Sequence, residues 1–290
     1  MKLILVTFLL LYSTLNSQDG HEWIKKGINS TDVKVRTECF SKAEKYYSKS
    51  PTTKRRKVDK DNLKSDIEAF TKVIKLNKFS AKEMSFVYFI RASTNYKLKN
   101  VDETISDYSK AIEGYPKFIE AYRRRSIPYY LKKREIQNAL KDYDKVIELS
   151  PNSAIDYQMR GMLRQGTKDK KGVLADYSKI IELKPKDIQG YDLRADYKLL
   201  CGDKKGAIDD CTLYIKAMPK DAKGYSKRAH YKSENKDKDG AIADYTKAIE
   251  LEPENLSLYT VRGLLYAEKD EYDKAKADMK KAMELKTKKK

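Results

Sequence analysis

Hydrophobic positions recur with a helical period through residues 85–289. The apolar positions of the last unit are Tyr259, Gly263 and Tyr266 in its first half and Ala275, Met279 and Ala282 in its second half. Spacings of three and four residues put these side chains on one face of a helix. A charged stretch such as residues 235–240 separates the two halves. Each unit is therefore predicted to be a helix, a short turn and a second helix.

The second half of each unit is a near-copy of the others. DYTKAIELEP at 244–253 is preceded by DYSKAIEGYP, DYDKVIELSP, DYSKIIELKP and DCTLYIKAMP. The opening aspartate recurs every 34 or 35 residues, at Asp107, Asp142, Asp176, Asp210, Asp244 and Asp278. Proline cannot continue a helix interior, so the closing prolines predict where the second helices stop. These prolines are Pro116, Pro151, Pro185, Pro219 and Pro253.

A recurring arginine precedes each aspartate, in a Tyr-x-x-Arg pattern. If the small residues Ala195 and Ala207 mark the crossing of two antiparallel helices, Arg194 comes to lie near Asp210. A catalytic site needs one constellation, whereas this pair recurs in every unit, so we interpret it as a structural ion pair. As an exposed pair it is expected to contribute about 0–1 kcal/mol.

The unit resembles the tetratricopeptide repeat, which has 34 residues with small, aromatic and proline positions at set places. Residues 222–255 carry Ala229, Ala241, Tyr245, Ala248 and Pro253 at those places. The resemblance implies an all-α fold, a right-handed superhelical solenoid of antiparallel helix pairs. The expected repeats are 85–118, 119–153, 154–187, 188–221, 222–255 and 256–289.

Residues 18–84 are expected to hold a degenerate first repeat with a basic insertion. Residues 1–17 read as a signal peptide, with Lys2 before a short apolar run. An exported protein, periplasmic or extracellular, is the expectation. Pro128 and one extra residue in the 119–153 unit predict a local kink or bulge in its first helix.

Charge adds a second hypothesis. Charged residues make up 36% of the chain and the formal net charge is +19. A lysine-rich solvated surface explains most of this excess, but a cluster stands out at Lys54, Arg55, Arg56 and Lys57. The alternative function is therefore docking on an anionic polymer, envelope or membrane surface. A nucleic-acid partner is not expected.

Catalytic and metal motifs are missing from the sequence. The two histidines, His21 and His230, stand apart from any cluster, and no nucleophile elbow, phosphate loop or Cys-x-x-Cys occurs. The same antiparallel register keeps Cys201 away from Cys211, which is expected to be a small buried hydrophobe. We expect no enzyme and no cofactor.

Binding is the function that remains. The resemblance implies a concave groove lined by first helices. This protein would bind a protein or peptide partner in that groove and so act as an adaptor or assembly factor. The candidate partner-binding residues are Phe86, Phe89, Arg123, Ile127, Met162, Gln165, Asp192, Asp196 and His230. For Phe86 and Phe89 the alternative is that the degenerate first repeat covers them. The last repeat is a candidate for contact between copies of the chain.

Overall fold

The computed structural model describes residue 26 and residues 60–76, 79–133 and 135–288. Three sequence predictions lie outside these residues: the signal peptide at 1–17, the N-terminal part of the degenerate first repeat, and the basic cluster at 54–57. Within the described residues the chain forms thirteen helices and no strand. They divide into two units, residues 1–170 and 171–290.

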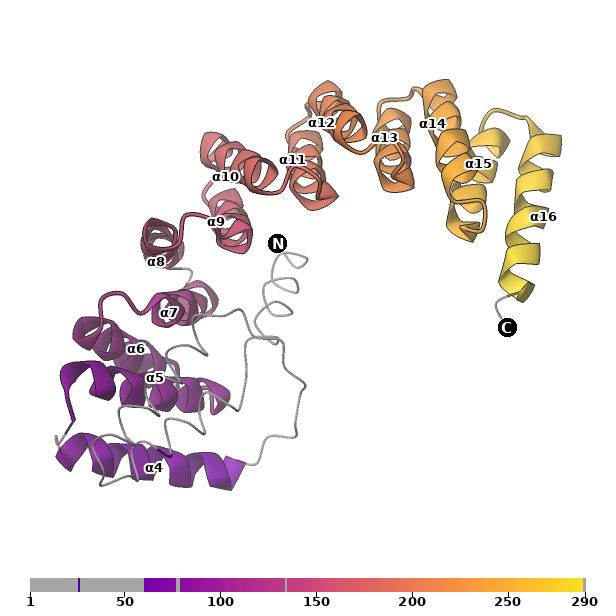
Figure 1. The fold of residues 1–290 in the computed structure, drawn as a ribbon. Helices are drawn as coiled ribbons and strands as arrows, with labels where there is room; N and C mark the ends of the chain where they lie inside the picture. Colours follow the sequence, from indigo (N-terminus) through magenta and orange to yellow (C-terminus); the bar gives the residue numbers. More distant parts are fainter. Residues whose placement is uncertain (1–25, 27–59, 77–78, 134, 289–290) are drawn as a thin grey trace. The chain divides into compact units, whose positions relative to one another are not determined.

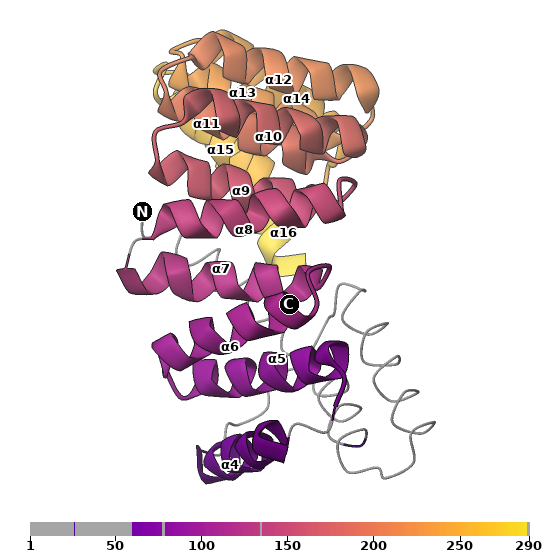
Figure 2. The ribbon, with the colours of Figure 1, turned by 90° about the vertical axis from the view of Figure 1, so that its left-hand side faces the viewer.

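Unit 1 holds the first described helices, which pack in sequence order, each against the next (Figures 1 and 2). They are α4 (Lys60–Leu76), α5 (Ala81–Lys97), α6 (Val101–Gly114), α7 (Ile119–Lys133), α8 (Ile136–Leu149) and α9 (Ala154–Gly166). Helices α5, α7 and α9 are the first helices of three repeats. Helix α4 has the place of a second helix ahead of them, as the sequence predicted.

Unit 2 continues the same alternation of first and second helices (Figure 1). Its helices are α11 (Ile188–Leu200), α12 (Lys204–Ala217), α13 (Ala222–Glu234), α14 (Lys238–Leu251), α15 (Leu256–Ala267) and α16 (Tyr272–Lys288). Helix α10 (Lys170–Leu183) contains the division between the units. The all-α repeat architecture predicted from the sequence is confirmed in both units.

The second helices α12 and α14 begin at an aspartate cap and end before a proline. Asp203 and Asp237 each accept the backbone N–H of the glycine three residues on, which satisfies one of the free donors at a helix start. A Cβ on Gly206 would clash with the Asp203 carboxylate, so the cap itself requires glycine. At the other end, α14 stops at Leu251, two residues before Pro253.

In five of the six repeats the turn contains one described residue with a left-handed backbone. Gly202 has φ 85° and Lys236, at the same place in the next repeat, has φ 65°. Lys99, Lys168 and Asp270 occupy the equivalent places with φ between 60° and 67°. Side-chain-bearing residues are strained in this region, so only the Gly202 turn has the residue that its backbone favours.

Small residues lie at the crossings of the helix pairs. Ala195 and Ala207 are fully buried, as are Ala229 and Ala241. At the last crossing a Cβ on Gly263 would lie 3.3 Å from the carbonyl oxygen of Ala275. The crossing residues predicted from the sequence are therefore those at which the helices approach most closely.

The extra residue of the 119–153 repeat lies in a turn. Helix α7 continues through Pro128 to Lys133. Other turns of this kind close with a bond over five residues, such as Asp203 N to the Lys198 oxygen, whereas Glu135 N bonds the Tyr129 oxygen over six. The extra residue therefore widens this turn, and the kink or bulge expected in the first helix stays a prediction.

Candidate partner-binding face

Each repeat is held by an arginine of its first helix. Arg194 donates to both carboxylate oxygens of Asp210, at 3.0 Å from Nε and 2.6 Å from Nη2. The same two-bond geometry joins Arg91 to Asp107, Arg125 to Asp142, Arg228 to Asp244 and Arg262 to Asp278. The antiparallel register inferred from the sequence is confirmed by these pairs. The sixth predicted pair would join the two units, whose relative placement is not defined.

These ion pairs are far less exposed than the sequence suggested. Asp244, expected at the surface, is only 5% exposed, and Lys232 reaches its second oxygen at 2.8 Å. The hydrogen bond from Arg228 to Asp244 outweighs burial and raises the pKa of the guanidinium. The aspartate is buried because antiparallel packing of the helix pair encloses its carboxylate. The charged donors then stabilise the enclosed carboxylate.

The third arginine nitrogen reaches into the preceding repeat. Nη1 of Arg262 donates to Oγ1 of Thr246 at 2.9 Å, and that hydroxyl donates to the carbonyl oxygen of Ile242. Equivalent bonds run from Arg91 to Thr71, from Arg125 to Ser109, from Arg194 to Ser178 and from Arg228 to Thr212. Arg160 finds Asp144 at this place instead, at 2.8 Å. The most repeated residues of the chain are thus occupied in holding repeats together.

Tyrosines of the first helices take part in the same framework. The hydroxyl of Tyr259 donates to the carbonyl oxygen of Pro253 at 3.1 Å, and the guanidinium of Arg262 lies 5.9 Å from the tyrosine ring. This ring and charge arrangement recurs for Arg91 over Tyr88, Arg125 over Tyr122, Arg160 over Tyr157 and Arg228 over Tyr225. The Tyr-x-x-Arg pattern therefore has a packing role.

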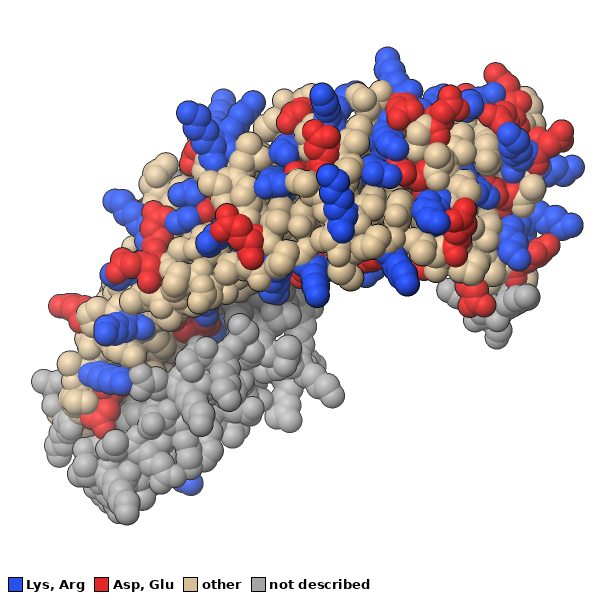
Figure 3. Space-filling view, turned by 45° about the horizontal axis from the view of Figure 1, so that its top comes forward, with Lys and Arg blue, Asp and Glu red and all other residues tan. Residues whose placement is uncertain are grey.

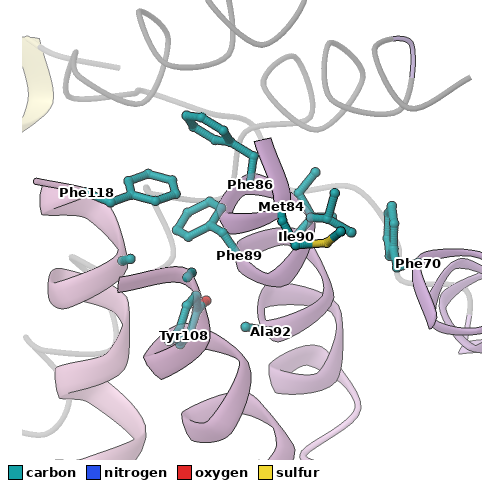
Figure 4. Packing of buried hydrophobic residues seen from close by; sticks show 11 residues of the cluster. Phe70, Met84, Phe86, Phe89, Ile90, Ala92, Tyr108 and Phe118 are labelled. Carbon is teal, nitrogen blue, oxygen red and sulfur yellow. The ribbon is translucent and has the colours of Figure 1, made fainter. Parts of the chain in front are cut away.

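The predicted aromatic anchors of unit 1 lie in a core. Phe86 and Phe89 are buried, with ring centroids 4.8 and 4.7 Å from that of Phe118 (Figure 4). Tyr108 closes the same cluster 5.6 Å from Phe89. These rings join α5 to α6 and to the start of α7, so the structure does not offer them to a partner.

Other predicted residues of unit 1 are also used within the unit. Ile127 and Met162 are buried in one hydrophobic cluster. Arg123 donates to both oxygens of Asp156, at 2.8 and 2.6 Å. Burial by itself would lower the pKa of Arg123, but the bonds to Asp156 outweigh it and raise the pKa. Gln165 is half-buried.

A buried charged pair in unit 1 was not singled out from the sequence. Arg124 is 1% exposed and its Nε donates to Glu120, also buried, at 2.8 Å. Its Nη1 lies 3.4 Å from the hydroxyl of Ser93, which shares a hydrogen bond with Tyr108. The spacing of Glu120 and Arg124, one helical turn, was the available signal. From their charge alone, Arg124 and Glu120 would be expected at the surface, because charged side chains are rarely buried unless they form a pair.

In unit 2 the predicted residues are accessible. Asp196 and His230 are exposed, and Asp192 is half-buried beside Lys227, whose Nζ lies 2.8 Å from its carboxylate. The buried hydroxyl of Tyr231 donates to Asp196 at 2.7 Å and to Asp192 at 3.1 Å. Burial, and then the bond to Asp196, raises the pKa of Tyr231. A neutral phenol therefore holds both carboxylates in place.

Leu264 occupies in α15 the place that Asp196 has in α11 and His230 has in α13. It is 52% exposed. We define the first-helix face of unit 2 as Asp192, Asp196, His230 and Leu264. The face presents a carboxylate, an imidazole and an aliphatic side chain on three successive first helices, and none of them belongs to the arginine framework.

No metal site accompanies the first-helix face. In the part of the chain that the structure describes, no three His, Cys, Asp or Glu side chains are grouped to hold a metal ion.

Basic and acidic side chains are interspersed over the visible face (Figure 3). Cys211 is buried, as predicted, with burial raising its thiol pKa to about 12, and Cys201 is exposed. None of the helices described is long and apolar enough to cross a membrane.

Stacked antiparallel helix pairs with a shared arginine framework define a helical repeat protein. Comparison with known proteins gives the kind of repeat: the tetratricopeptide repeat family matches residues 222–255 and 256–289. Residues 222–289 therefore carry two tetratricopeptide repeats. The C-terminal part of a tetratricopeptide repeat-containing protein from Cytophaga hutchinsonii has the same fold, with a TM-score of 0.57, 17% identity, and coverage of 77% of this chain and 90% of that one.

Two further similarities are weaker. A tetratricopeptide repeat protein from Parabacteroides merdae is 20% identical, with a TM-score of 0.49 over 93% of this chain and 94% of that one. The human DnaJ homolog subfamily C member 7 is 29% identical over 87 residues, 30% of this chain. This chain spans 17% of the length of that curated relative.

Proposed function

We propose that this protein is a non-enzymatic scaffold that binds a protein or peptide on the first-helix face of unit 2. It would act as an adaptor or assembly factor. One observation carries the proposal: Asp196, His230 and Leu264 hold equivalent places in three repeats, yet they differ in chemistry and are all accessible. Residues that build the array are repeated and buried, so this variation is free to serve recognition.

The chemistry of the face suits a segment that pairs a basic residue with an apolar one. Tyr231 fixes one oxygen of Asp196, which leaves the carboxylate oriented and exposed toward solvent. Lys227 forms an ion pair with Asp192 and also interacts electrostatically with Asp196, so the two carboxylates together exceed the single lysine charge. Leu264 provides the apolar contact. Oriented groups lose less entropy on binding, which favours affinity from a small face.

Export is part of the proposal and rests on residues 1–17, whose composition is that of a signal peptide. The partner would then be met in the periplasm or outside the cell. The scaffold role, as opposed to catalysis, rests on the use of the repeated charged residues as structural pairs.

The test is affinity capture from intact source cells with a triple variant, Asp196→Asn, His230→Ala and Leu264→Ala, in which the amide oxygen of Asn still accepts from Tyr231. We expect the partner recovered by the wild-type protein to be lost, with an unchanged melting temperature, because none of the three side chains belongs to the buried core. A matched control replaces Leu213, Lys247 and Glu250, which are exposed on second helices, and should keep the partner.

Unchanged capture by the triple variant would remove the first-helix face from consideration. Capture that survives the triple variant but falls steeply between 50 and 200 mM salt would instead favour docking through the basic cluster, as counterion release requires at about these concentrations.

A further inference from the structure

Every second helix before the last presents the same three-residue stripe to the repeat that follows. The stripe is an aliphatic residue, a hydroxyl or Asp144, and an isoleucine, spaced i, i+4 and i+7. Its members are Ile67, Thr71 and Ile74; Ile105, Ser109 and Ile112; Leu140, Asp144 and Ile147; Leu174, Ser178 and Ile181; Ile208, Thr212 and Ile215; and Ile242, Thr246 and Ile249.

The stripe is the surface on which the next first helix packs. Ile215 approaches Gly224 so closely that a Cβ there would lie 2.9 Å from its Cγ1. Thr246 accepts the guanidinium of Arg262 at 2.9 Å, and Ile249 is only 8% exposed in the cluster that joins α14 to α15. The middle position must therefore be an acceptor, because the incoming residue is an arginine that can only donate.

Helix α16 departs from this stripe at all three positions. Lys276, Lys280 and Met283 stand there, and Lys286 follows one turn later. Met283 is 71% exposed, in contrast with Ile249 at the same place in the preceding repeat. Lys276, Lys280 and Lys286 are exposed and make no ion pair with any residue that the structure describes. We call Lys276, Lys280, Met283 and Lys286 the end face; α16 is the yellow helix of Figure 1.

We propose that the end face docks a helix of a partner protein that carries an acidic residue where a repeat would carry its arginine. An ammonium group has donors and no acceptor, so Lys280 would repel the arginine that Thr246 receives in the array. A carboxylate at that place meets Lys280 and has Lys276 one turn away on the same helix face. Met283 supplies an unbranched apolar contact that adapts to the partner's surface.

The same charge disfavours a second copy of the chain, and the experiment below separates docking from a plain polar cap. A second copy of the chain, docking one of its repeats as the internal repeats dock, would bring its arginine against Lys280. A plain polar cap, the usual requirement at the end of a repeat array, would bind nothing. Both alternatives give distinct results in the following experiment.

The probe is a stapled, fluorescent helix with the sequence of residues 254–270, because α15 is a helix shaped for such a stripe. One version carries Arg262→Glu and the other keeps Arg262. Fluorescence anisotropy with the full-length chain is expected to show the acidic probe binding about three- to fivefold more tightly than the basic one, the range that one exposed ion pair provides.

The decisive variant is Lys280→Thr, which restores the hydroxyl of the internal stripes. It should narrow the preference for the acidic probe, because the basic probe regains a hydroxyl acceptor for its arginine while Lys276 still favours the acidic probe. Lys216→Thr, at an exposed lysine of α12, should leave both affinities unchanged, and a matching melting temperature confirms that Lys280→Thr is folded. Equal binding of the two probes, no binding at all, or a preference unaffected by Lys280→Thr would overturn the proposal. A dimer in sedimentation that is lost on Lys280→Thr would overturn it in favour of a second copy.

Discussion

At the scale of single residues, three positions of the repeated decapeptide DYTKAIELEP accept hydrogen bonds from first helices. Asp244 accepts the arginine of its own repeat, Thr246 accepts the arginine of the next, and the carbonyl of Pro253 accepts Tyr259. Three of its positions thus hold neighbours together, in addition to the core positions Tyr245, Ala248 and Ile249. The motif recurs because each junction needs the same bonds.

Removing one buried carboxylate should cost far more than removing an exposed one. Asp210→Ala leaves Arg194 and Lys198 without their shared partner inside the helix pair, so we expect a loss of about 3–5 kcal/mol in the free energy of unfolding. Urea denaturation measures it. Glu250→Ala, which breaks an exposed pair with Lys247, should cost about 0–1 kcal/mol. Equal losses for the two variants would contradict the buried role.

At the scale of helices, the second helix does two jobs. One side pairs with its own first helix through the aspartate, and another presents the stripe to the next repeat. The hydroxyl in the middle of the stripe connects them, because it donates to its own helix and accepts from the neighbouring arginine. Because α16 has a lysine in place of this hydroxyl, it cannot accept a hydrogen bond from an arginine at that position.

The junction bond can be isolated with a pair of threonines. Thr246→Val keeps the side-chain shape but leaves Nη1 of Arg262 without its acceptor, so we expect a loss of about 1–3 kcal/mol. Thr260→Val removes a hydroxyl that bonds only the carbonyl of Leu256 in its own helix and should cost less. The two free energies of unfolding are compared by urea denaturation; a larger loss for Thr260→Val would contradict the junction role.

At the scale of the whole molecule, stability comes from contacts between neighbouring helices, as expected for a repeat array. Many of these contacts bury tyrosine hydroxyls. Burial raises the pKa of Tyr108 to about 12, and it raises those of Tyr143, Tyr214 and Tyr231 as well. The folded state therefore keeps phenolic protons that the unfolded chain would release.

Alkaline pH should unfold the protein for this reason. Tyr108 loses its proton near pH 10 when unfolded and at about 12 when folded, so the folded state binds more protons between these values. Stability is then unaffected by this group below pH 10 and falls as the pH rises toward 12. Tyr108→Phe should make the free energy of unfolding fall less steeply across that window. An unchanged slope would contradict burial of this hydroxyl.

Much of the fold could be predicted from the sequence because it is local or periodic. The 34-residue period, the helical spacing and the prolines predict helix pairs, and the small residues at the crossing predict the register that brings Arg194 to Asp210. Each of these follows from the chain's own geometry within one repeat. The partner-binding residues were less predictable, since periodicity places a side chain on a helix face without saying what covers that face.

By itself, then, the sequence determined the repeat, its helix pairs and the ion pair within each. Only the tertiary structure decided which charged and aromatic residues are enclosed. Phe86 and Phe89 proved to be core, Arg124 and Glu120 form a buried pair, and the third nitrogen of each arginine bonds the preceding repeat. The reason is that burial depends on the neighbouring helices across a junction, and their approach is set by packing rather than by the spacing of residues along one chain segment.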